Sequence, residues 1–291
     1  MPRLGVLGWP VGHSRSPAMH EAAFRSLGVD GWTYQRLPVP PALFAETVRA
    51  LPPIGFAGAN VTIPHKEAAL ALADEATDAA REIGAANTLT FTDAGVIAAE
   101  NTDAPGLLAS LPGPARGKTA LVLGAGGAGR AAAWALRNAG AAEVRVWNRT
   151  VERARALAAD LDVNLAETPA PADFLVNCTS VGLDARPTQF KGLPVTADAL
   201  GEFACVVDLV YREGETALIR EARRRGCAVV DGLEILVHQG ALSFGLWTGL
   251  EPPLEAMRDG ARGRPSGRDD EREPPSPSPR ARDSGRGSTR P

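Results

Sequence analysis

Three glycines at a fixed spacing carry the clearest chemical signal in the chain. Gly124, Gly126 and Gly129 follow the apolar run 121–123 and precede an alanine-rich stretch of helical character. In that setting the first glycine permits a tight turn, the second lets the backbone approach a pyrophosphate, and the third lets helix and strand pack closely. The helix that follows would direct its unpaired N–H groups at the phosphates. The pattern therefore predicts a loop that binds a dinucleotide.

The residues after the next expected strand indicate which dinucleotide binds. Residues 143–147 are typical of a second strand, and Asn148, Arg149 and Thr150 follow it. Where such a unit binds NAD, an acidic side chain normally holds the ribose 2′-hydroxyl at this place. Arg149, with Arg153 one helical turn later, could instead bind a 2′-phosphate through paired hydrogen bonds. The sequence thus favours NADP over NAD. The alternative is a solvated arginine after a strand.

Polar residues of a different kind are concentrated at strand and helix ends in the first part of the chain. They are hydroxyls, amides, one amine and one carboxylate: Ser14, Ser16, Asn60, Thr62, Lys66, Asn87, Thr88, Asn101, Thr102 and Asp103. An amine can donate a proton to a carbonyl oxygen that gains negative charge, and can accept it back in the reverse reaction. The set suits a small ligand rich in hydroxyl groups, oxidised or reduced beside the dinucleotide.

Composition narrows the class of protein. The chain has 291 residues, of which 44% are hydrophobic, enough for one large or two ordinary domains with a substantial core. A net charge of −3 argues against nucleic acid as a partner. Cys178, Cys205 and Cys227 are odd in number and widely spaced, which predicts buried free thiols and a reducing compartment.

Signals for targeting and for metal binding are absent from the sequence. No apolar run reaches the length of a membrane span, and residues 4–8 are strand-like with no signal-peptide h-region before them. We therefore expect a cytoplasmic protein with no membrane partner. None of the four histidines is grouped with cysteines or acids at metal-ligand spacing, so no metal site is predicted.

An alternation of strand-like and helical segments must position these residues. In the first part of the chain, one helix is expected to begin at Ser16-Pro17, and three more are expected at 41–49, 64–73 and 78–83. The expected strands are 4–7, 32–37, 58–62 and a hairpin of 87–91 with 96–99. Ser16 is the expected N-cap of the first helix. Either Thr102 or Asp103 is expected to cap a helix at 104–110.

The second part repeats the pattern more regularly. The expected helices are 127–138, 151–159, 216–225 and a final apolar helix at 233–248, and the expected strands are 119–123, 144–147, 174–178, 205–209 and 228–230. Alternating strands and helices imply a parallel sheet that is covered on both faces. The fold class is therefore α/β, with two α/β domains and a cleft between them.

The predicted domains divide the chain into three parts. Residues 1–102 form a substrate-binding domain, completed by the C-terminal helical segment 233–257, and residues 103–232 form a Rossmann-type, doubly wound NADP domain. Residues 258–291 are rich in Arg, Pro, Ser and Gly and are expected to be a disordered tail. The tail is either a weak electrostatic tether to an acidic partner or a dispensable extension.

Taken together and in order, motifs between residue 4 and about residue 250 resemble those of the shikimate dehydrogenase family. They are GWPVGHSRSP at 8–17, NVTIPHK at 60–66, GAANT at 84–88, NTD at 101–103, the glycine loop at 124–129, NRT at 148–150, NCTSVG at 177–182 and GLEILVHQ at 232–239. Each motif alone is weak, but the ordered combination is highly specific.

The resemblance implies reversible, NADP-dependent reduction of 3-dehydroshikimate to shikimate, in the pathway to chorismate and the aromatic amino acids. It implies that Lys66 transfers the proton with Asp103 as its partner. The implied substrate contacts are Ser14, Ser16, Thr62, Lys66, Asn87, Asp103, Tyr211 and Gln239. The implied NADP contacts are Asp78, Gly124, Ala125, Gly126, Gly127, Ala128, Asn148, Arg149, Thr150, Arg153, Leu209 and Gly232. Family members are monomers or homodimers.

Several of these residues also have plainer interpretations. Lys66 could be a solvated lysine in the first turn of a helix, although a cation is disfavoured there. Asn87 could hold the hairpin, and Tyr211 could be a core residue at a strand end. Burial of Lys66 disfavours its charged form and a nearby Asp103 favours it, so the sequence leaves the resting protonation of Lys66 open.

Two positions depart from the family pattern. Glu213 stands where proline is common, and Ile235 stands where methionine is usual near the nicotinamide. We expect a changed loop at Glu213. Isoleucine keeps the apolar volume of methionine but loses its flexibility, so cofactor affinity should change while activity is retained.

Three rival functions share features of this sequence. A quinate/shikimate dehydrogenase with relaxed choice of substrate or cofactor is the nearest, although Arg149 speaks against NAD. A non-catalytic NADP-sensing module would keep the glycine loop but would not need Lys66 and Asp103. Methylenetetrahydrofolate dehydrogenase has a similar two-domain layout but lacks the Ser-x-Ser-Pro pattern of residues 14–17.

Overall fold

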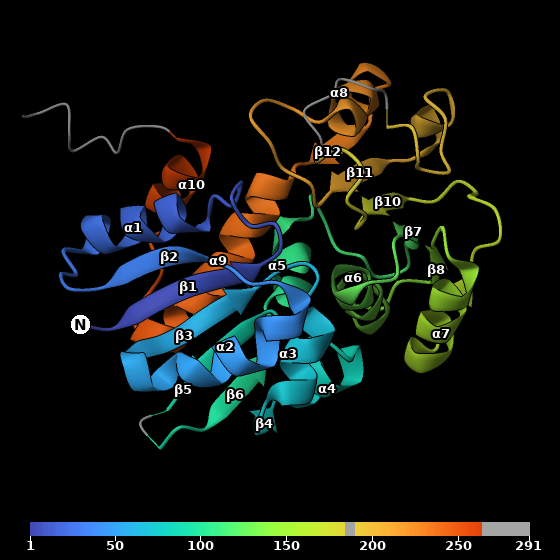
Figure 1. The fold of residues 1–291 in the computed structure, drawn as a ribbon. Coiled ribbons are helices and arrows are strands. Elements are labelled where there is room, and N and C mark those ends of the chain that lie inside the picture. Colours follow the sequence, from blue (N-terminus) through green and yellow to red (C-terminus); the bar gives the residue numbers. More distant parts are fainter. Residues whose placement is uncertain (93, 184–189, 264–291) are drawn as a thin grey trace, which may run out of the picture.

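Two six-stranded sheets, one in each of two lobes, form the frame of the molecule (Figure 1). The computed structural model describes residues 1–92, 94–183 and 190–263. The first lobe holds strands β1 to β6, and the second lobe holds β7 to β12. Helix α5, Asp103–Ser110, packs against α9 of the first lobe and α6 of the second, so it lies where the lobes join. An α/β protein with two sheets was predicted, and the structure confirms it.

The first sheet is mixed, with strand order β2-β1-β3-β5-β6-β4. β1 pairs in parallel with β2 and β3, whereas β5 pairs antiparallel with β3 and with β6, its partner in the predicted hairpin. The strands are β1 Arg3–Gly8, β2 Thr33–Pro38, β3 Phe56–Val61, β4 Glu75–Ala76, β5 Thr88–Phe91 and β6 Ile97–Glu100.

Helices from both ends of the sequence cover this first sheet. Four come from the N-terminal part: α1 Ser16–Leu27, α2 Phe44–Ala50, α3 Lys66–Leu72 and α4 Asp78–Ile83, with short 3₁₀ turns at Pro41–Leu43 and Pro52–Ile54. Two come from the C-terminal part: α9 Gly232–Thr248 and α10 Leu254–Arg262. Phe244 and Met257 pack with Leu4 and Met19 in one buried cluster, which fixes the returning chain to the first lobe. Burial of such side chains contributes roughly 1.5–3 kcal/mol each.

The second sheet is parallel in every strand pair that the structure describes, with order β12-β11-β10-β7-β8-β9. Its strands are β7 Thr119–Leu123, β8 Glu143–Trp147, β9 Asn164–Leu165, β10 Phe174–Asn177, β11 Cys205–Asp208 and β12 Ala228–Val230. The helices are α6 Gly127–Asn138, α7 Val151–Leu161 and α8 Ala217–Arg224, with a 3₁₀ turn at Ala199–Glu202. Because the strands are parallel, the loops after β7, β10 and β11 gather at one edge, where open α/β sheets bind ligands.

Two capping predictions were wrong. Ser16 is the first residue of α1 rather than its cap, and its backbone N–H donates to the Ser14 hydroxyl at 3.3 Å. Neither Thr102 nor Asp103 caps α5 with its side chain, because Asn101 takes that place and accepts from the Ala104 N–H at 3.1 Å. The carboxylate of Asp103 is therefore available for other partners.

The expected start of the tail was also wrong. The segment expected as one C-terminal helical segment, 233–257, is two helices, because Gly249 adopts a left-handed conformation (φ 68°) and ends α9. The second helix, α10, continues to Arg262, so residues 258–262 are not a tail. Its buried Met257 and Ala261 pack in the same cluster as Met19 of α1. The rest of the predicted tail, residues 264–291, lies outside the described residues.

The three cysteines are free thiols, as predicted, but only Cys205 is fully buried. Cys178 and Cys227 are half-buried, so the expectation of burial is wrong for these two. No helix among the described residues is long and apolar enough to cross a membrane.

Candidate active site

A cavity of about 140 Å³ lies between the lobes and collects polar residues from both. All of the predicted substrate contacts line it: Ser14, Ser16, Thr62, Lys66, Asn87, Asp103, Tyr211 and Gln239. Three of the predicted cofactor contacts line the same cavity: Ala128 and Leu209 from the second lobe, and Gly232, with Ile235, from the start of α9. Residues up to 233 positions apart in sequence, from Val6 to Gln239, therefore meet at one place, where a substrate and a dinucleotide could be adjacent.

Lys66 and Asp103 form an ion pair in the wall of this cavity. Lys66 Nζ lies 2.5 Å from Asp103 Oδ2, and the two side chains are 13% and 12% exposed. The amine comes from the first residue of α3 and the carboxylate from the first residue of α5. The carboxylate holds the amine in one position at the cavity surface, which is what a proton donor to a bound carbonyl needs. The interpretation of Lys66 as a freely solvated lysine does not fit this geometry.

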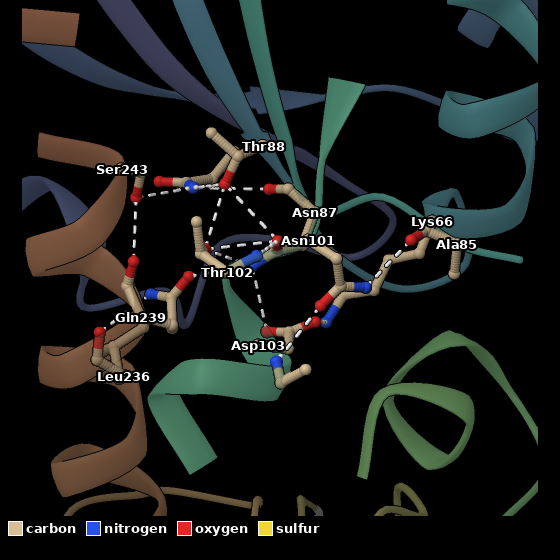
Figure 2. A network of polar contacts seen from close by, with 12 residues as sticks. Lys66, Ala85, Asn87, Thr88, Asn101, Thr102, Asp103, Leu236, Gln239 and Ser243 are labelled. Atoms are coloured by element: carbon tan, nitrogen blue, oxygen red, sulfur yellow. Dashed lines mark hydrogen bonds and ion pairs between the residues drawn. The ribbon is translucent and has the colours of Figure 1, made fainter. Parts of the chain in front are cut away.

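Asn87 is the centre of the hydrogen-bond network behind that pair (Figure 2). Its Nδ2 lies 3.0 Å from Asp103 Oδ1, 2.9 Å from Thr102 Oγ1 and 3.1 Å from Gln239 Oε1, while its Oδ1 accepts from the Thr102 N–H at 2.7 Å. Gln239 in turn donates to the Leu236 carbonyl at 2.8 Å. Asn87 thus ties the hairpin to α5 and to α9, a larger role than holding the hairpin turn alone.

A second buried network supports the floor of the cavity. Asn60 accepts a hydrogen bond from the Tyr34 hydroxyl at 2.8 Å, and its amide donates to Thr88 Oγ1 at 3.2 Å and to Ser243 Oγ at 3.1 Å. All of these polar residues are at most 5% exposed. Buried polar groups that satisfy one another hold a single arrangement, because leaving any of them unpaired costs about 1–3 kcal/mol. The sequence analysis missed Tyr34 and Ser243, although a serine on an otherwise apolar helix is a usable signal.

The Ser14–Ser16 turn is held from outside the cavity by an arginine that the sequence analysis also missed. Arg36, on β2, donates from Nε and Nη2 to the Ser14 carbonyl at 3.0 and 2.6 Å. Tyr211 lies on the same side, and burial raises the pKa of its phenol, although hydrogen bonds with Ser14 and with the Arg15 backbone oppose the rise. The phenol therefore stays protonated near neutral pH. Because Tyr211 lines the cavity, its hydroxyl can donate a hydrogen bond to a ligand there.

The glycine loop has the geometry that a dinucleotide requires. Gly124 directly follows β7 with φ 108°, a conformation that suits glycine, and a Cβ on Gly129 would overlap the Gly124 carbonyl oxygen. A Cβ on Gly126 would meet nothing within 4 Å, so the space beside it is open to a ligand. Asn148 accepts from the Ala125 N–H at 3.1 Å and donates to the Thr150 carbonyl at 2.9 Å, which joins the loop to the end of β8. These residues fit a bound pyrophosphate at the start of α6.

The two candidate arginines for the 2′-phosphate differ in their surroundings. Arg149 is exposed, and its guanidinium has no hydrogen bond or ion pair with any other described residue. Arg153 instead lies 3.4 Å from the Glu67 carboxylate of α3, a pair in which both side chains are more than half exposed. Asp78, also a predicted cofactor contact, is exposed at the start of α4 and does not line the cavity.

A buried carboxylate supports the second-lobe wall of the cavity. Asp208, at the end of β11, accepts from Asn177 Nδ2 at 2.8 Å, Thr216 Oγ1 at 2.6 Å and the Val210 N–H at 3.1 Å. Burial raises the pKa of Asp208 to about 6, against the opposing effect of these hydrogen bonds. The network fixes the chain on either side of Leu209, which lines the cavity. Across the parts of the chain that the structure describes, no group of histidine, cysteine and acidic residues could hold a metal ion.

Three models of protein families match successive parts of the chain. The model described as the shikimate dehydrogenase substrate binding domain matches residues 6–89, and that described as shikimate / quinate 5-dehydrogenase matches residues 108–180. The model described as the shikimate 5'-dehydrogenase C-terminal domain matches residues 232–260.

Individual relatives match over most of their length. A protein of Methylobacterium radiotolerans named shikimate dehydrogenase (NADP(+)) is 48% identical over 267 residues, which is 86% of this chain and 93% of the relative. A protein of the same name from Thermus thermophilus is 47% identical over 271 residues, 90% of this chain and 98% of the relative. A crystal structure of shikimate 5-dehydrogenase from Thermus thermophilus, in complex with NADP(H) and shikimate, superposes with a TM-score of 0.81 at 44% identity and covers 90% of this chain and 99% of that one.

Proposed function

The chain belongs to the shikimate dehydrogenase family, and from that premise we propose that it reduces 3-dehydroshikimate to shikimate with NADPH, reversibly. This step belongs to the pathway to chorismate and the aromatic amino acids. The observation that carries the proposal is the Lys66–Asp103 pair, which faces the glycine-loop lobe across one cavity lined with hydroxyls and amides.

Lys66 is the proton donor in this proposal. The bound nicotinamide would supply the hydride that reduces the ketone carbon. As the carbonyl oxygen gains negative charge, Lys66 Nζ donates a proton to it and becomes neutral; in the reverse direction the neutral amine takes the proton from the hydroxyl. Asp103 holds Nζ in place through the 2.5 Å contact, and Asn87 fixes Asp103 from behind. Asp103 and Asn87 thereby set the position from which the proton moves.

The remaining polar residues bind and orient the substrate. Tyr211, Ser14 and Ser16 offer hydroxyl groups on one side of the cavity, and Thr62, Asn87 and Gln239 offer hydroxyl and amide groups elsewhere in its lining. A cyclic substrate with several hydroxyls and one carboxylate can satisfy such groups, whereas an apolar substrate would leave them unpaired at a cost of about 1–3 kcal/mol each.

NADP is held mainly by the second lobe. The open space beside Gly126 and the free N–H groups at the start of α6 would receive the pyrophosphate. Arg149, which is exposed and has no partner among the described residues, would receive the 2′-phosphate, with Arg153 nearby on α7. Leu209, Gly232 and Ile235 line the part of the cavity where the nicotinamide would meet the substrate.

The direct test is the loss of NADPH absorbance when 3-dehydroshikimate is added to the purified protein. Turnover supports the proposal. A folded protein that binds NADPH without turnover would instead be a cofactor sensor. The relaxed alternative has one specific observation in its favour, because the family description matched by residues 108–180 names quinate as well as shikimate. Kinetics with both substrates and both cofactors decide that point, and a preference for quinate with NAD would overturn the proposed choice.

Compartment and assembly stay predictions from the sequence. We propose a cytoplasmic protein that is a monomer or a homodimer. Light scattering on the purified protein measures the assembly, and fractionation of cells measures the compartment.

A further inference from the structure

A second cavity, the rim cavity, adjoins the first, because His13, Leu183 and Tyr211 line both. We propose that this rim cavity is an electrostatic entry site for a carboxylate, and that it attracts the anionic substrate before the substrate reaches Lys66. It has a volume of about 330 Å³, and its lining includes Arg15, Arg36, Tyr211 and Glu213. The inference rests on the proposed function, because it takes the ligand to be the carboxylate of 3-dehydroshikimate or shikimate.

The two cavities share a wall, so a ligand in one lies next to the other. His13 and Tyr211 line both, with their ring centroids 6.4 Å apart. An anion that enters the rim cavity therefore contacts the same phenol that the proposed substrate would contact inside. The positions of these two rings make the rim cavity an approach to the reaction site rather than a separate site.

The rim cavity carries an excess of positive charge that the inner cavity lacks. Inside, the ammonium of Lys66 is paired with the carboxylate of Asp103, so that the pair adds no net charge. Among the described lining residues of the rim, Arg15 and Arg36 outnumber the one carboxylate, Glu213. An anionic ligand thus finds its charge complement at the rim. Such fields raise the rate at which charged ligands reach a site.

Arg36 is held where its charge can act on the substrate. Its two hydrogen bonds to the Ser14 carbonyl fix the guanidinium directly behind a residue that lines the inner cavity. The field reaches the shared wall: burial lowers the pKa of His13 and the charge of Arg36 lowers it further. The charges of Arg15 and Arg36 likewise oppose the rise that burial causes in the pKa of Tyr211. The positive charge of the arginines therefore acts on both rings, and the same charge would attract a carboxylate bound beside them.

Glu213 is the element of the rim that opposes entry. It is exposed and stands where the family pattern commonly has proline, so this chain places a negative charge among the arginines. Replacing Glu213 and replacing an arginine should therefore change substrate capture in opposite directions. This opposition separates an electrostatic effect from a structural one, because damage to the fold lowers activity in both cases.

The test begins with the unmodified protein, because turnover of 3-dehydroshikimate must be established first. Arg15→Gln and Glu213→Gln are then compared by kcat/KM at low and high salt. Arg49→Gln is the matched control, since Arg49 is an exposed arginine of the same lobe that lines neither cavity. The methyl ester of 3-dehydroshikimate serves as an uncharged substrate, and the Kd for NADPH is measured for every variant.

At low salt, we expect Arg15→Gln to lower kcat/KM by roughly three- to tenfold and Glu213→Gln to raise it by roughly two- to fivefold, with kcat nearly unchanged. The differences should disappear near 1 M salt, where the screening length is about 3 Å, and should not occur with the methyl ester. Unchanged or lowered kcat/KM in Glu213→Gln would overturn the inference, as would effects on NADPH binding in place of substrate capture. An unmodified protein without turnover would refute the proposed function instead.

Discussion

On the first lobe's side of the cavity, buried polar side chains hold one another in place; in the second lobe, the glycine loop and the end of β8 are open to a ligand. Asn87, Asp103 and Gln239 are joined by hydrogen bonds of 3.0 and 3.1 Å. In the second lobe, Gly126 leaves open space and Arg149 is exposed without a partner among the described residues. The difference teaches that the substrate side is prepared in advance for a precise fit, whereas the cofactor side provides room and an uncommitted charge.

The two sides meet where α6 begins. A Cβ built on Gly127 would lie 2.6 Å from Lys66 Cβ and 3.3 Å from Ala85 Cβ, so the first residue of α6 packs directly on the residue that carries the amine. Further along the same helix, Arg130 donates to the Ile83 carbonyl at 2.5 Å. One helix thus starts at the proposed phosphate site and also supports the base of the proton donor.

The largest effect is expected at the centre of the substrate side. Lys66→Ala should lower kcat by roughly 10² to 10⁴-fold, because no other amine lies in the described lining of the cavity. The Kd for NADPH should change little, since the cofactor is held from the other lobe. Stopped-flow or steady-state kinetics with fluorescence titration of NADPH measure the two quantities. Lys118→Ala, which removes an exposed lysine paired with Asp173, is the control. Unchanged turnover in Lys66→Ala would exclude the amine from the mechanism.

A smaller effect is expected where the two sides touch. Substitutions at two adjacent glycines distinguish an effect on the position of Lys66 from an effect on cofactor binding. Gly127→Ala should push Lys66 away from its position and lower kcat by roughly 10²-fold, the loss expected for a displacement of about 1 Å, while NADPH still binds. Gly126→Ala is the matched control, because its methyl group would meet no protein atom within 4 Å and would instead enter the space left for the pyrophosphate. It should raise the Kd for NADPH and retain more of kcat at saturating cofactor. Equal effects from both glycines would show that Gly127 is only part of the phosphate loop.

Sequence patterns predicted the elements whose ends are set by neighbouring residues. Helix α4 was predicted with its observed bounds, because Thr77 accepts from the Ala80 N–H at its start and Gly84 adopts φ 74° at its end. Strand β7 and helix α6 were also predicted with their observed bounds, since the glycine loop separates them. The residues that cap a helix or form a turn lie next to its ends in the sequence, so such ends can be recognised from the sequence alone.

Contacts between distant segments could not be predicted in the same way. The bond from Asn87 to Gln239 joins residues 152 positions apart, and Arg36 reaches Ser14 only because β2 lies beside β1. Helix α10 was missed because four of its nine residues are charged and only one side, with Met257 and Ala261, is buried. Such features depend on which surfaces the fold brings together, so the sequence indicated candidate residues of the site but not the network that holds them.

On the cofactor side, the exposed arginine should set the choice between NADP and NAD. Arg149→Ala should raise the Kd for NADPH by about 10- to 100-fold, since hydrogen bonds to a charged group are worth about 1.5–3 kcal/mol. The Kd for NADH should change little, because NADH has no 2′-phosphate. Arg155→Ala provides the control, as Arg155 is an exposed arginine on the neighbouring helix α7. Fluorescence titrations with both cofactors measure the effect, and equal losses for the two would contradict this role.

The smallest effect tests whether the substrate side restrains the cofactor side. Glu67 follows Lys66 directly and lies 3.4 Å from Arg153, so in this structure a carboxylate of the first lobe occupies an arginine proposed for the 2′-phosphate. An exposed pair of this kind is worth about 0.2–1 kcal/mol, which limits the gain on releasing it to about fivefold. Glu67→Gln should therefore lower the Kd for NADPH by roughly two- to fivefold and leave that for NADH unchanged. Glu46→Gln, at an exposed glutamate of α2, controls for net charge. If both variants shift both cofactors alike, general charge explains the change and Arg153 contributes nothing specific.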